Sequence, residues 1–320
     1  MNLNFINDVI ALYELGDLKK DPIKMDGGIT NQVYTIETSK GKYILKILFN
    51  AETDKIEFAE KIAELAKEND ILSLGAIKRN DKYVNTVDQK KFLLYPFYDG
   101  KILKSKDITV EQVGFLAREL AKLHSIKVLN IKDKIEMYSK IDFTKYYQMI
   151  KEFNEEEYNL FKDKIDELVG IYEQVYDAYI NLSSQVSYIH RDYNRKNILW
   201  KSSNEFAIID WETATVGNPS IDFFKSSWFM TDDVKDDKFI TFKNEYLKIM
   251  HLEDDYKKGA LAGIIEECNW LDFSFKRALN IGDNYSQDEI ILGKEAIKSS
   301  LTEIINYYNN IDKMLDLLKK

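Results

Sequence analysis

The strongest constraint on the fold of this chain is a segment in which two short apolar runs flank a polar turn. The runs are ILW at 198–200 and FAII at 206–209, and the turn between them is KSSNE. Apolar runs of this length around a polar turn predict a β-hairpin. Asn197 precedes the first run and Asp210 follows the second, so we expect both side chains at the open end of the hairpin. Asp192 is expected on the loop that enters it.

These three residues are of the types that phosphoryl transfer requires. A carboxylate such as Asp192 orients the acceptor hydroxyl and accepts its proton, while an amide and a second carboxylate hold Mg²⁺ on the phosphates of the donor. Mg²⁺ prefers oxygen ligands, which Asn197 and Asp210 supply. The segment therefore predicts one catalytic residue, Asp192, and two metal ligands, Asn197 and Asp210.

The sequence motifs of this segment resemble those of a known family. H-x-D-x-x-x-x-N at 190–197, IIDWE at 208–212 and GNPSID at 217–222 resemble the aminoglycoside phosphotransferase and choline kinase group. The resemblance implies a bilobal, protein-kinase-like α+β fold, with an antiparallel sheet and one helix in the N-lobe and a mainly helical C-lobe. It also implies Mg²⁺-dependent transfer of the γ-phosphate of ATP or GTP to a small-molecule hydroxyl.

Protein kinases form the second enzyme class to consider. They usually place Phe-Gly after the metal aspartate, where this chain has Trp211 and Glu212. Asp210 and Asp222 are only twelve positions apart, too few for a long regulatory loop. We therefore expect a small-molecule acceptor. By the resemblance, Asp222 braces the catalytic loop, and we expect His190 to have a structural role beneath it.

The pattern along the chain predicts where the lobes lie. Short helices are expected at 3–15 and 53–68, and strands at 23–25, 32–37, 42–48, 82–87 and 91–95. Helical spacing then dominates, at 109–125, 144–182, 233–251, 256–279 and 287–318. We expect lobes of residues 1–97 and 98–320, divided near Pro96 and Gly100.

Lys46 is the candidate for holding the nucleotide phosphates. It lies in the apolar run YILKIL, where a charged side chain is costly unless it is paired. The resemblance assigns it to the α- and β-phosphates, positioned by a glutamate of the 53–68 helix. We expect that glutamate to be Glu57, with Glu60 as the alternative. An outward-facing lysine on a half-exposed strand is the structural alternative.

Two further segments are expected to contact the nucleotide. GGITN at 27–31 takes the place of the phosphate-covering loop, where the Thr30 hydroxyl would reach a phosphate, unless the segment is only a hairpin turn. FLLYPFYDG at 92–100 resembles the hinge that binds the base. With Tyr95 at the back of the pocket, Pro96 would supply a carbonyl and Tyr98 an amide. The side chains do not distinguish ATP from GTP.

The acceptor is expected beside the C-terminal helices, with candidate contacts from Glu266, Glu267, Trp270 and Asp272. Carboxylates there would bind an ammonium group, and Trp270 would stack on a sugar or a cation. Alternatively, Glu267 and similar polar residues form a solvated stripe, and Trp270 packs in the core. We expect an aminoglycoside, amino sugar or amino alcohol; the alternatives are a choline/ethanolamine kinase, a homoserine kinase, or a nucleotide-binding pseudokinase without turnover.

Composition narrows the classes of partner. The net charge is −9, from 54 acidic and 45 basic residues, which disfavours nucleic acid and suits a cationic acceptor, although a mildly acidic surface is ordinary. The single cysteine, Cys268, allows no disulfide within the chain. The N-terminus has no signal-peptide pattern, and the longest apolar segment, at 92–98, is too short to cross a membrane. We expect a cytoplasmic protein.

Overall fold

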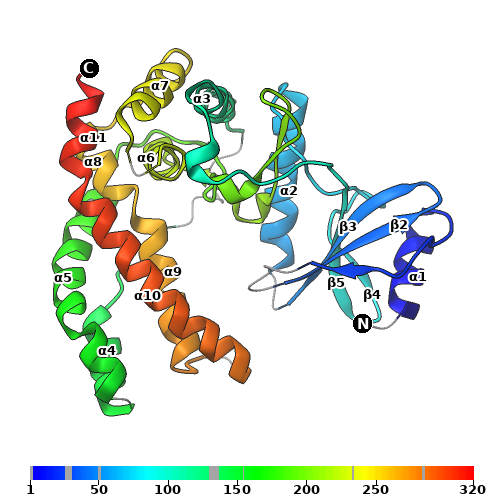
Figure 1. Cartoon of the computed structure of the whole chain (residues 1–320), viewed down its shortest axis with the longest axis horizontal. Helices are drawn as coiled ribbons and strands as arrows, with labels where there is room; N and C mark the ends of the chain where they lie inside the picture. The colour runs from blue at the N-terminus through cyan, green and yellow to red at the C-terminus, as the bar shows by residue number, and fades with distance from the viewer. Residues whose placement is uncertain are drawn as a thin grey trace. The chain divides into compact units, whose positions relative to one another are not determined.

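The computed structural model describes residues 3–25, 31–49, 52–129, 137–153, 155–232, 234–282 and 285–320. The chain forms two compact units. The first comprises Met1–Leu103 and Arg195–Thr215, and the second comprises Lys104–Asn194 and Val216–Lys320. The first contains an antiparallel sheet and the second is mainly helical, as the α+β prediction requires (Figure 1).

The first unit is built on a five-stranded antiparallel sheet in the order β1-β2-β3-β5-β4 (Figure 1). Its strands are β1 (Ile23–Lys24), β2 (Gln32–Thr38), β3 (Gly41–Leu48), β4 (Asn85–Val87) and β5 (Lys90–Pro96). Each pair of neighbours is antiparallel. The strands predicted from apolar alternation are therefore confirmed within a few residues.

Alternating side chains divide this sheet into two apolar faces. On β5, Phe92 and Leu94 belong to one buried cluster, and Leu93 and Tyr95 belong to the other. The helix α1 (Leu3–Leu12) contributes to the first cluster, and α2 (Thr53–Glu68) contributes Ile56 to the second. Because successive side chains of a strand point to opposite faces, each helix covers one face of the sheet.

The same alternation places Lys46. On β3, Leu45 and Ile47 lie in the α1 cluster, whereas Ile44 and Leu48 lie in the α2 cluster. Lys46 falls between Ile44 and Leu48 in the period of two, so its side chain leaves the sheet on the face that α2 covers. The strand register therefore directs the lysine toward the side of the sheet where α2 packs.

The predicted hairpin is present in the first unit. β7 (Ile198–Trp200) and β8 (Phe206–Ile208) pair antiparallel, with Ile198 opposite Ile208. Backbone hydrogen bonds tie it to residues of the sheet-bearing segment: Leu74 N donates to Ile208 O, and Lys101 N donates to Trp200 O, both at 2.9 Å. The expected lobe boundary groups this hairpin with the helices, whereas the packing groups it with the sheet.

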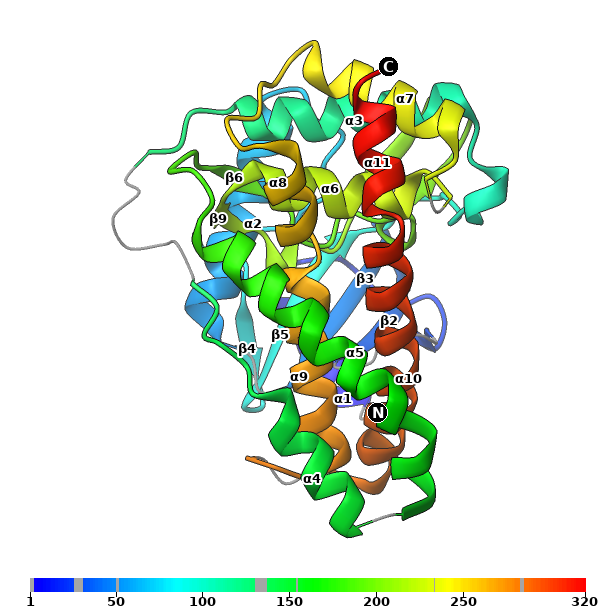
Figure 2. The ribbon, with the colours of Figure 1, turned by 90° about the vertical axis from the view of Figure 1, so that its left-hand side faces the viewer.

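The second unit is mainly helical. Its helices are α3 (Val110–Ser125), α4 (Phe143–Phe153), α5 (Glu155–Ile180), α6 (Pro219–Met230), α7 (Asp236–Leu247), α8 (Tyr256–Ala262), α9 (Ile265–Ala278), α10 (Gln287–Asn309) and α11 (Ile311–Leu318). A short strand, β6 (Ser187–Ile189), pairs with β9 (Thr215–Gly217). α9 and α10 run side by side, with α5 packed against both (Figure 2). No described helix combines the length and apolarity needed to cross a bilayer.

α6 is the helix that periodicity does not predict. Nearly all its residues are buried, so its sequence has no polar face to set against an apolar one. Its start does carry a signal, because the Asn218 side chain accepts a hydrogen bond from Ser220 N and Pro219 occupies the first turn. This helix matters for the site because it carries Asp222 and Lys225.

Candidate active site

In the first unit, Lys46 forms two ion pairs. Its Nζ lies 2.8 Å from Asp210 Oδ1 and 2.7 Å from Glu212 Oε1. Glu212 also accepts a hydrogen bond from Asn31 Nδ2 at 3.3 Å. The Lys46 and Glu212 side chains are 16% and 14% exposed, whereas that of Asp210 is 41% exposed. The lysine thus joins the sheet to the segment that follows the hairpin.

Burial and charge act in opposite directions on this group. Burial alone lowers the pKa of Lys46, but Asp210 and Glu212 raise it above its ordinary value. Burial raises the pKa of Glu212, an effect that Lys46 opposes and Asp210 reinforces. We conclude that the lysine remains charged and that its charge is what makes two neighbouring carboxylates tolerable there.

Glu57 does not occupy the predicted position beside Lys46. Its Oε1 accepts hydrogen bonds from the backbone amides of Tyr83 at 3.0 Å and Val84 at 2.8 Å. The carboxylate therefore anchors the segment before β4. This is a correction to the expected lysine partner: in this structure the ion-pair partners of Lys46 are Asp210 and Glu212, which the packing of the hairpin brings to β3.

Glu60, the alternative partner, is fully buried. Its Oε1 accepts from Tyr95 Oη and its Oε2 from Ala76 N, both at 2.7 Å. Burial raises the pKa of Glu60 to about 7, partly offset by these hydrogen bonds and by the charge of Lys46. Glu60 thus lies near enough to Lys46 to feel its charge, and it holds the hydroxyl of Tyr95, the residue expected at the back of the base pocket.

Asn197 and Asp210 lie together at the open end of the hairpin, as predicted. Asn197 is buried at the end of the 3₁₀ turn η3 (Arg195–Asn197), and its carbonyl accepts from Ile209 N at 2.9 Å. Asp210 has φ 61°, a left-handed conformation that turns the chain sharply after β8. An amide oxygen and a carboxylate are suitable donors for Mg²⁺, which keeps its other sites for phosphate and water.

The other predicted nucleotide contacts are Pro96, Tyr98 and Thr30. Pro96 ends β5 opposite Tyr43, and its carbonyl and the Tyr98 amide remain predicted base contacts. The Tyr98 carbonyl accepts from Gly100 N at 2.9 Å, which forms a tight turn after the strand. Thr30 lies outside the described residues.

In the second unit, Asp192 follows β6 on the loop that leads to the hairpin. It is half-buried, and its Oδ1 accepts from Asn194 Nδ2 at 2.6 Å. Its backbone carbonyl accepts from Asn194 N at 2.9 Å. These two bonds from one residue form a local turn that orients the carboxylate.

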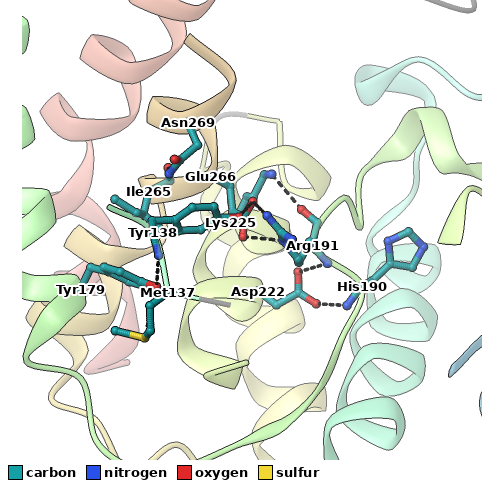
Figure 3. A network of polar contacts seen from close by, with 10 residues as sticks. All are labelled: Met137, Tyr138, Tyr179, His190, Arg191, Asp222, Lys225, Ile265, Glu266 and Asn269. Atoms are coloured by element: carbon teal, nitrogen blue, oxygen red, sulfur yellow. Dashed lines mark hydrogen bonds and ion pairs between the residues drawn. The ribbon is translucent and has the colours of Figure 1, made fainter. Parts of the chain in front are cut away.

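Asp222 on α6 supports this loop from within. It is buried and accepts from the backbone N of His190 at 2.8 Å and of Arg191 at 3.1 Å (Figure 3). Its Oδ2 also lies 3.2 Å from His124 Nε2, and His124 Nδ1 lies 2.6 Å from Tyr246 Oη. Burial raises the pKa of Asp222, but His124 and His190 outweigh burial and bring the pKa below its ordinary value. The carboxylate therefore stays ionised.

The four candidate acceptor contacts have different surroundings in the structure. Glu266 is bound bidentately by Arg191, and Asp272 accepts from Tyr146 Oη at 2.6 Å and pairs with Lys276 at 2.7 Å. Trp270 packs on Phe273, with 5.4 Å between ring centroids. These three residues are therefore engaged in contacts within the helical unit, and their acceptor contacts stay predictions.

Glu267 differs from Glu266 because it interacts electrostatically with Asp192. Its Oε1 accepts from Ser300 Oγ at 2.9 Å. Burial raises its pKa; Lys225 and Ser300 lower it, while the carboxylates of Glu303 and Asp192 raise it. Three acidic side chains from the loop, α9 and α10 thus share one region with the Lys225 ammonium.

Three residues of the candidate site were not predicted from the sequence: Glu212, Lys225 and Arg191. Glu212 was noted only as a departure from the protein kinase motif, although its position two residues after Asp210 carries it toward the same lysine. Lys225 lies on the helix that periodicity failed to find. Arg191 has a signal in the sequence, because an arginine beside the expected catalytic aspartate is a charge that needs a partner.

Comparison with known proteins supports the family resemblance. A model of the phosphotransferase enzyme family matches residues 23–258. No curated protein sequence matches the chain. The structure is similar to that of spectinomycin phosphotransferase in complex with ADP and spectinomycin, with a TM-score of 0.70 and 12% identity over 94% of this chain and 98% of that chain.

Two further kinases are also similar in structure. The ethanolamine kinase of Plasmodium vivax has a TM-score of 0.58 and 17% identity, over 95% of this chain and 85% of that chain. The choline kinase of Cryptosporidium parvum has a TM-score of 0.53 and 13% identity, over 92% and 90%. At these identities the likeness shows the fold, so the predicted kinase-like α+β fold is confirmed.

Proposed function

Because the chain belongs to the phosphotransferase enzyme family and is a small-molecule kinase, we propose that it transfers the γ-phosphate of ATP or GTP to a hydroxyl of a cationic amino compound. The acceptor class is an aminoglycoside, an amino sugar or an amino alcohol. We place the reaction in the cytoplasm, where both donors are available.

The charged residues around Asp192 are the observation that supports a cationic acceptor. Burial raises the pKa of Glu267; Lys225 and Ser300 lower it, and the carboxylates of Glu303 and Asp192 raise it, so the net shift is upward even with the Lys225 ammonium nearby. An ammonium group placed among them would lower the pKa of Glu267 and offset the repulsion. An acceptor with an amine near its hydroxyl therefore suits this region better than a neutral sugar.

Each residue of the proposed reaction has a distinct role. Asp192 orients the acceptor hydroxyl and accepts its proton as the new bond to phosphorus forms. Lys46 neutralises charge on the α- and β-phosphates. Asn197 and Asp210 would hold Mg²⁺, which supplies positive charge to the phosphates of the donor.

The proposal is tested by a coupled assay of nucleotide consumption. ATP and GTP with Mg²⁺ are each offered with a panel of aminoglycosides, amino sugars, choline, ethanolamine and homoserine. We expect turnover that depends on a cationic acceptor. Asp192→Asn should lower kcat by roughly 10²- to 10⁴-fold, as loss of a general base does.

A matched control is Asp177→Asn, which makes the same change on an exposed position of α5. It should retain wild-type turnover. Turnover that survives Asp192→Asn would remove that residue from the mechanism. Turnover with choline or ethanolamine alone would identify the chain as an amino-alcohol kinase, whereas turnover with homoserine, a zwitterion, would argue against the cationic acceptor.

A further inference from the structure

We infer that Glu266 on α9 is a positioning residue: it clamps Arg191 and thereby sets the conformation of the loop that carries Asp192. The inference rests on the proposed function, because it assigns Asp192 to the reaction. It assigns no contact between Glu266 and either substrate. It also replaces the acceptor-binding role that the sequence suggested for Glu266.

The clamp is a two-bond ion pair. Arg191 Nε donates to Glu266 Oε1 at 2.9 Å, and Arg191 Nη2 donates to Glu266 Oε2 at 3.0 Å (Figure 3). Parallel bonds of this kind fix the plane of the guanidinium as well as its position. The two side chains are only 17% and 10% exposed, so water screens the pair weakly.

Tyr138 closes the clamp from a third segment of the chain. Its hydroxyl donates to Glu266 Oε2 at 2.6 Å, and its ring centroid lies 5.2 Å from Arg191 Cζ (Figure 3). One oxygen of Glu266 thus accepts from both Arg191 and Tyr138. The aromatic face adds a cation–π contact to the guanidinium. Together these contacts leave the Arg191 side chain little freedom to reorient.

The backbone of Arg191 is held as firmly as its side chain. Its φ is 67°, a left-handed conformation that is unfavourable for a residue with a Cβ atom. Its N donates to Asp222 Oδ1 at 3.1 Å, and its carbonyl accepts from Lys225 Nζ at 2.8 Å. Helix α6 therefore holds the backbone while α9 holds the side chain.

This arrangement bears on Asp192 because the two residues are adjacent. The direction in which the Asp192 carboxylate leaves the chain depends on the unusual φ of Arg191, which the surrounding bonds maintain. The clamp also occupies the guanidinium, which would otherwise be a mobile cation beside the Asp192 carboxylate. Loss of Glu266 should therefore disturb Asp192 although Glu266 itself touches no reacting atom.

The test compares Glu266→Gln, Arg191→Met and the double variant. We expect each single change to lower kcat on the order of 10- to 100-fold, since small displacements of a catalytic group have effects of this size. The KM for the nucleotide should stay unchanged, because Lys46 belongs to the other compact unit. The double variant should lose no more than one single variant, because both changes break the same clamp.

Glu245→Gln is the matched control. It breaks an Arg–Glu pair between α3 and α7, in which Arg118 Nη1 lies 2.5 Å from Glu245 Oε2. This pair belongs to the same unit but involves no residue of the catalytic loop. The control should keep the wild-type kcat and lose no more stability than Glu266→Gln, because its pair is more exposed, at 36% and 19%. An equal fall of kcat in the control would overturn the inference.

Hydrogen exchange provides a readout that does not depend on turnover. Amides in peptides spanning residues 187–197 should exchange faster in Glu266→Gln than in the wild type, and Glu245→Gln should leave them unchanged. Unchanged exchange there, or faster exchange with wild-type kcat, would overturn the inference. A wild-type protein without turnover would count against the proposed function alone, and the exchange result would still decide whether Glu266 orders the loop.

Tyr138→Phe covers the case in which Glu266→Gln does not fold. It removes only the hydroxyl that donates to Glu266 Oε2 and keeps the ring over Arg191. We expect a fall in kcat of a few-fold with an unchanged nucleotide KM. A wild-type kcat in this variant, together with wild-type exchange at 187–197, would contradict the clamp.

Discussion

Lys46 Nζ on β3 lies 2.8 Å from Asp210 Oδ1, although 164 positions separate the two residues in the chain. The strand places the lysine on the α2 face of the sheet, and the hairpin carries the aspartate to the same place. Glu212 makes a second ion pair with the lysine at 2.7 Å. The phosphate-binding lysine and the metal-binding aspartate proposed for the reaction are therefore already a single charged unit.

Lys46→Met should damage both stability and turnover. It leaves the largely buried carboxylate of Glu212 without its cation, and breaking a buried pair in this way typically costs about 3 kcal/mol of unfolding free energy. Loss of charge at the phosphates should lower kcat on the order of 100-fold. Chemical denaturation and steady-state kinetics measure the two effects. Wild-type kcat/KM in this variant would exclude a phosphate role for Lys46.

Asp210→Asn should raise the Mg²⁺ concentration that half-maximal turnover requires. Changes in outer-shell partners alone weaken metal sites by about 10- to 100-fold, so loss of a ligand charge should exceed tenfold. A titration of turnover against Mg²⁺ gives the shift. Glu205→Gln, in the exposed turn of the same hairpin, is the control and should titrate as the wild type does. Equal Mg²⁺ dependence in both variants would rule out Asp210 as a ligand.

Changes at Glu57 should alter stability and leave kcat unchanged. Glu57→Ala removes the carboxylate that accepts from both the Tyr83 and Val84 amides. This should lower the unfolding free energy by about 1–3 kcal/mol. Glu57→Gln keeps an oxygen acceptor and should be nearly neutral. Denaturation and kinetics on the same preparations separate the effects. A large fall in kcat for Glu57→Gln would restore the original assignment of this residue as the lysine partner.

Glu60 should make the protein less stable as the pH rises. Its pKa is raised by burial from 4.5 to about 7, so the folded state binds the proton more tightly than the unfolded state does. Its contribution is complete below pH 4.5 and is lost as the pH rises through 7, a change of about 3 kcal/mol. Glu60→Gln cannot titrate, so the stability of the wild type relative to this variant should fall across that window.

Urea denaturation at pH 4.5, 6 and 8 measures this difference. The wild-type and Glu60→Gln proteins share every other titrating group, so subtracting their unfolding free energies isolates Glu60. A pH-independent difference would mean that the carboxyl titrates normally in the folded protein.

The elements that carry the site were predictable because their signals are local. The α2 bounds, 53–68, follow from apolar spacing alone, and the hairpin at 198–208 follows from two apolar runs around a polar turn. Pairing of adjacent strands then places Asn197 and Asp210 at one end without any information about the rest of the fold. α6 was missed because a helix buried on nearly all sides has no periodicity to detect.

The partners of the charged residues were not predictable from spacing. Glu57 and Glu60 are three residues apart on one helix face, so sequence alone treats them alike. One is bound by the Tyr83 and Val84 amides and the other by Tyr95 and Ala76, according to which segments pack against α2. The sequence of α2 alone does not determine either set of partners.

The adjacent residues Glu266 and Glu267 make the same point in the helical unit. The sequence by itself predicted that both carboxylates lie on a helix, within residues 256–279, because helical spacing depends on nearby residues. Only the tertiary structure decided that Glu266 clamps Arg191 while Glu267 joins the surroundings of Asp192. Successive side chains on a helix point about 100° apart, and what each one meets depends on elements that are distant in the chain.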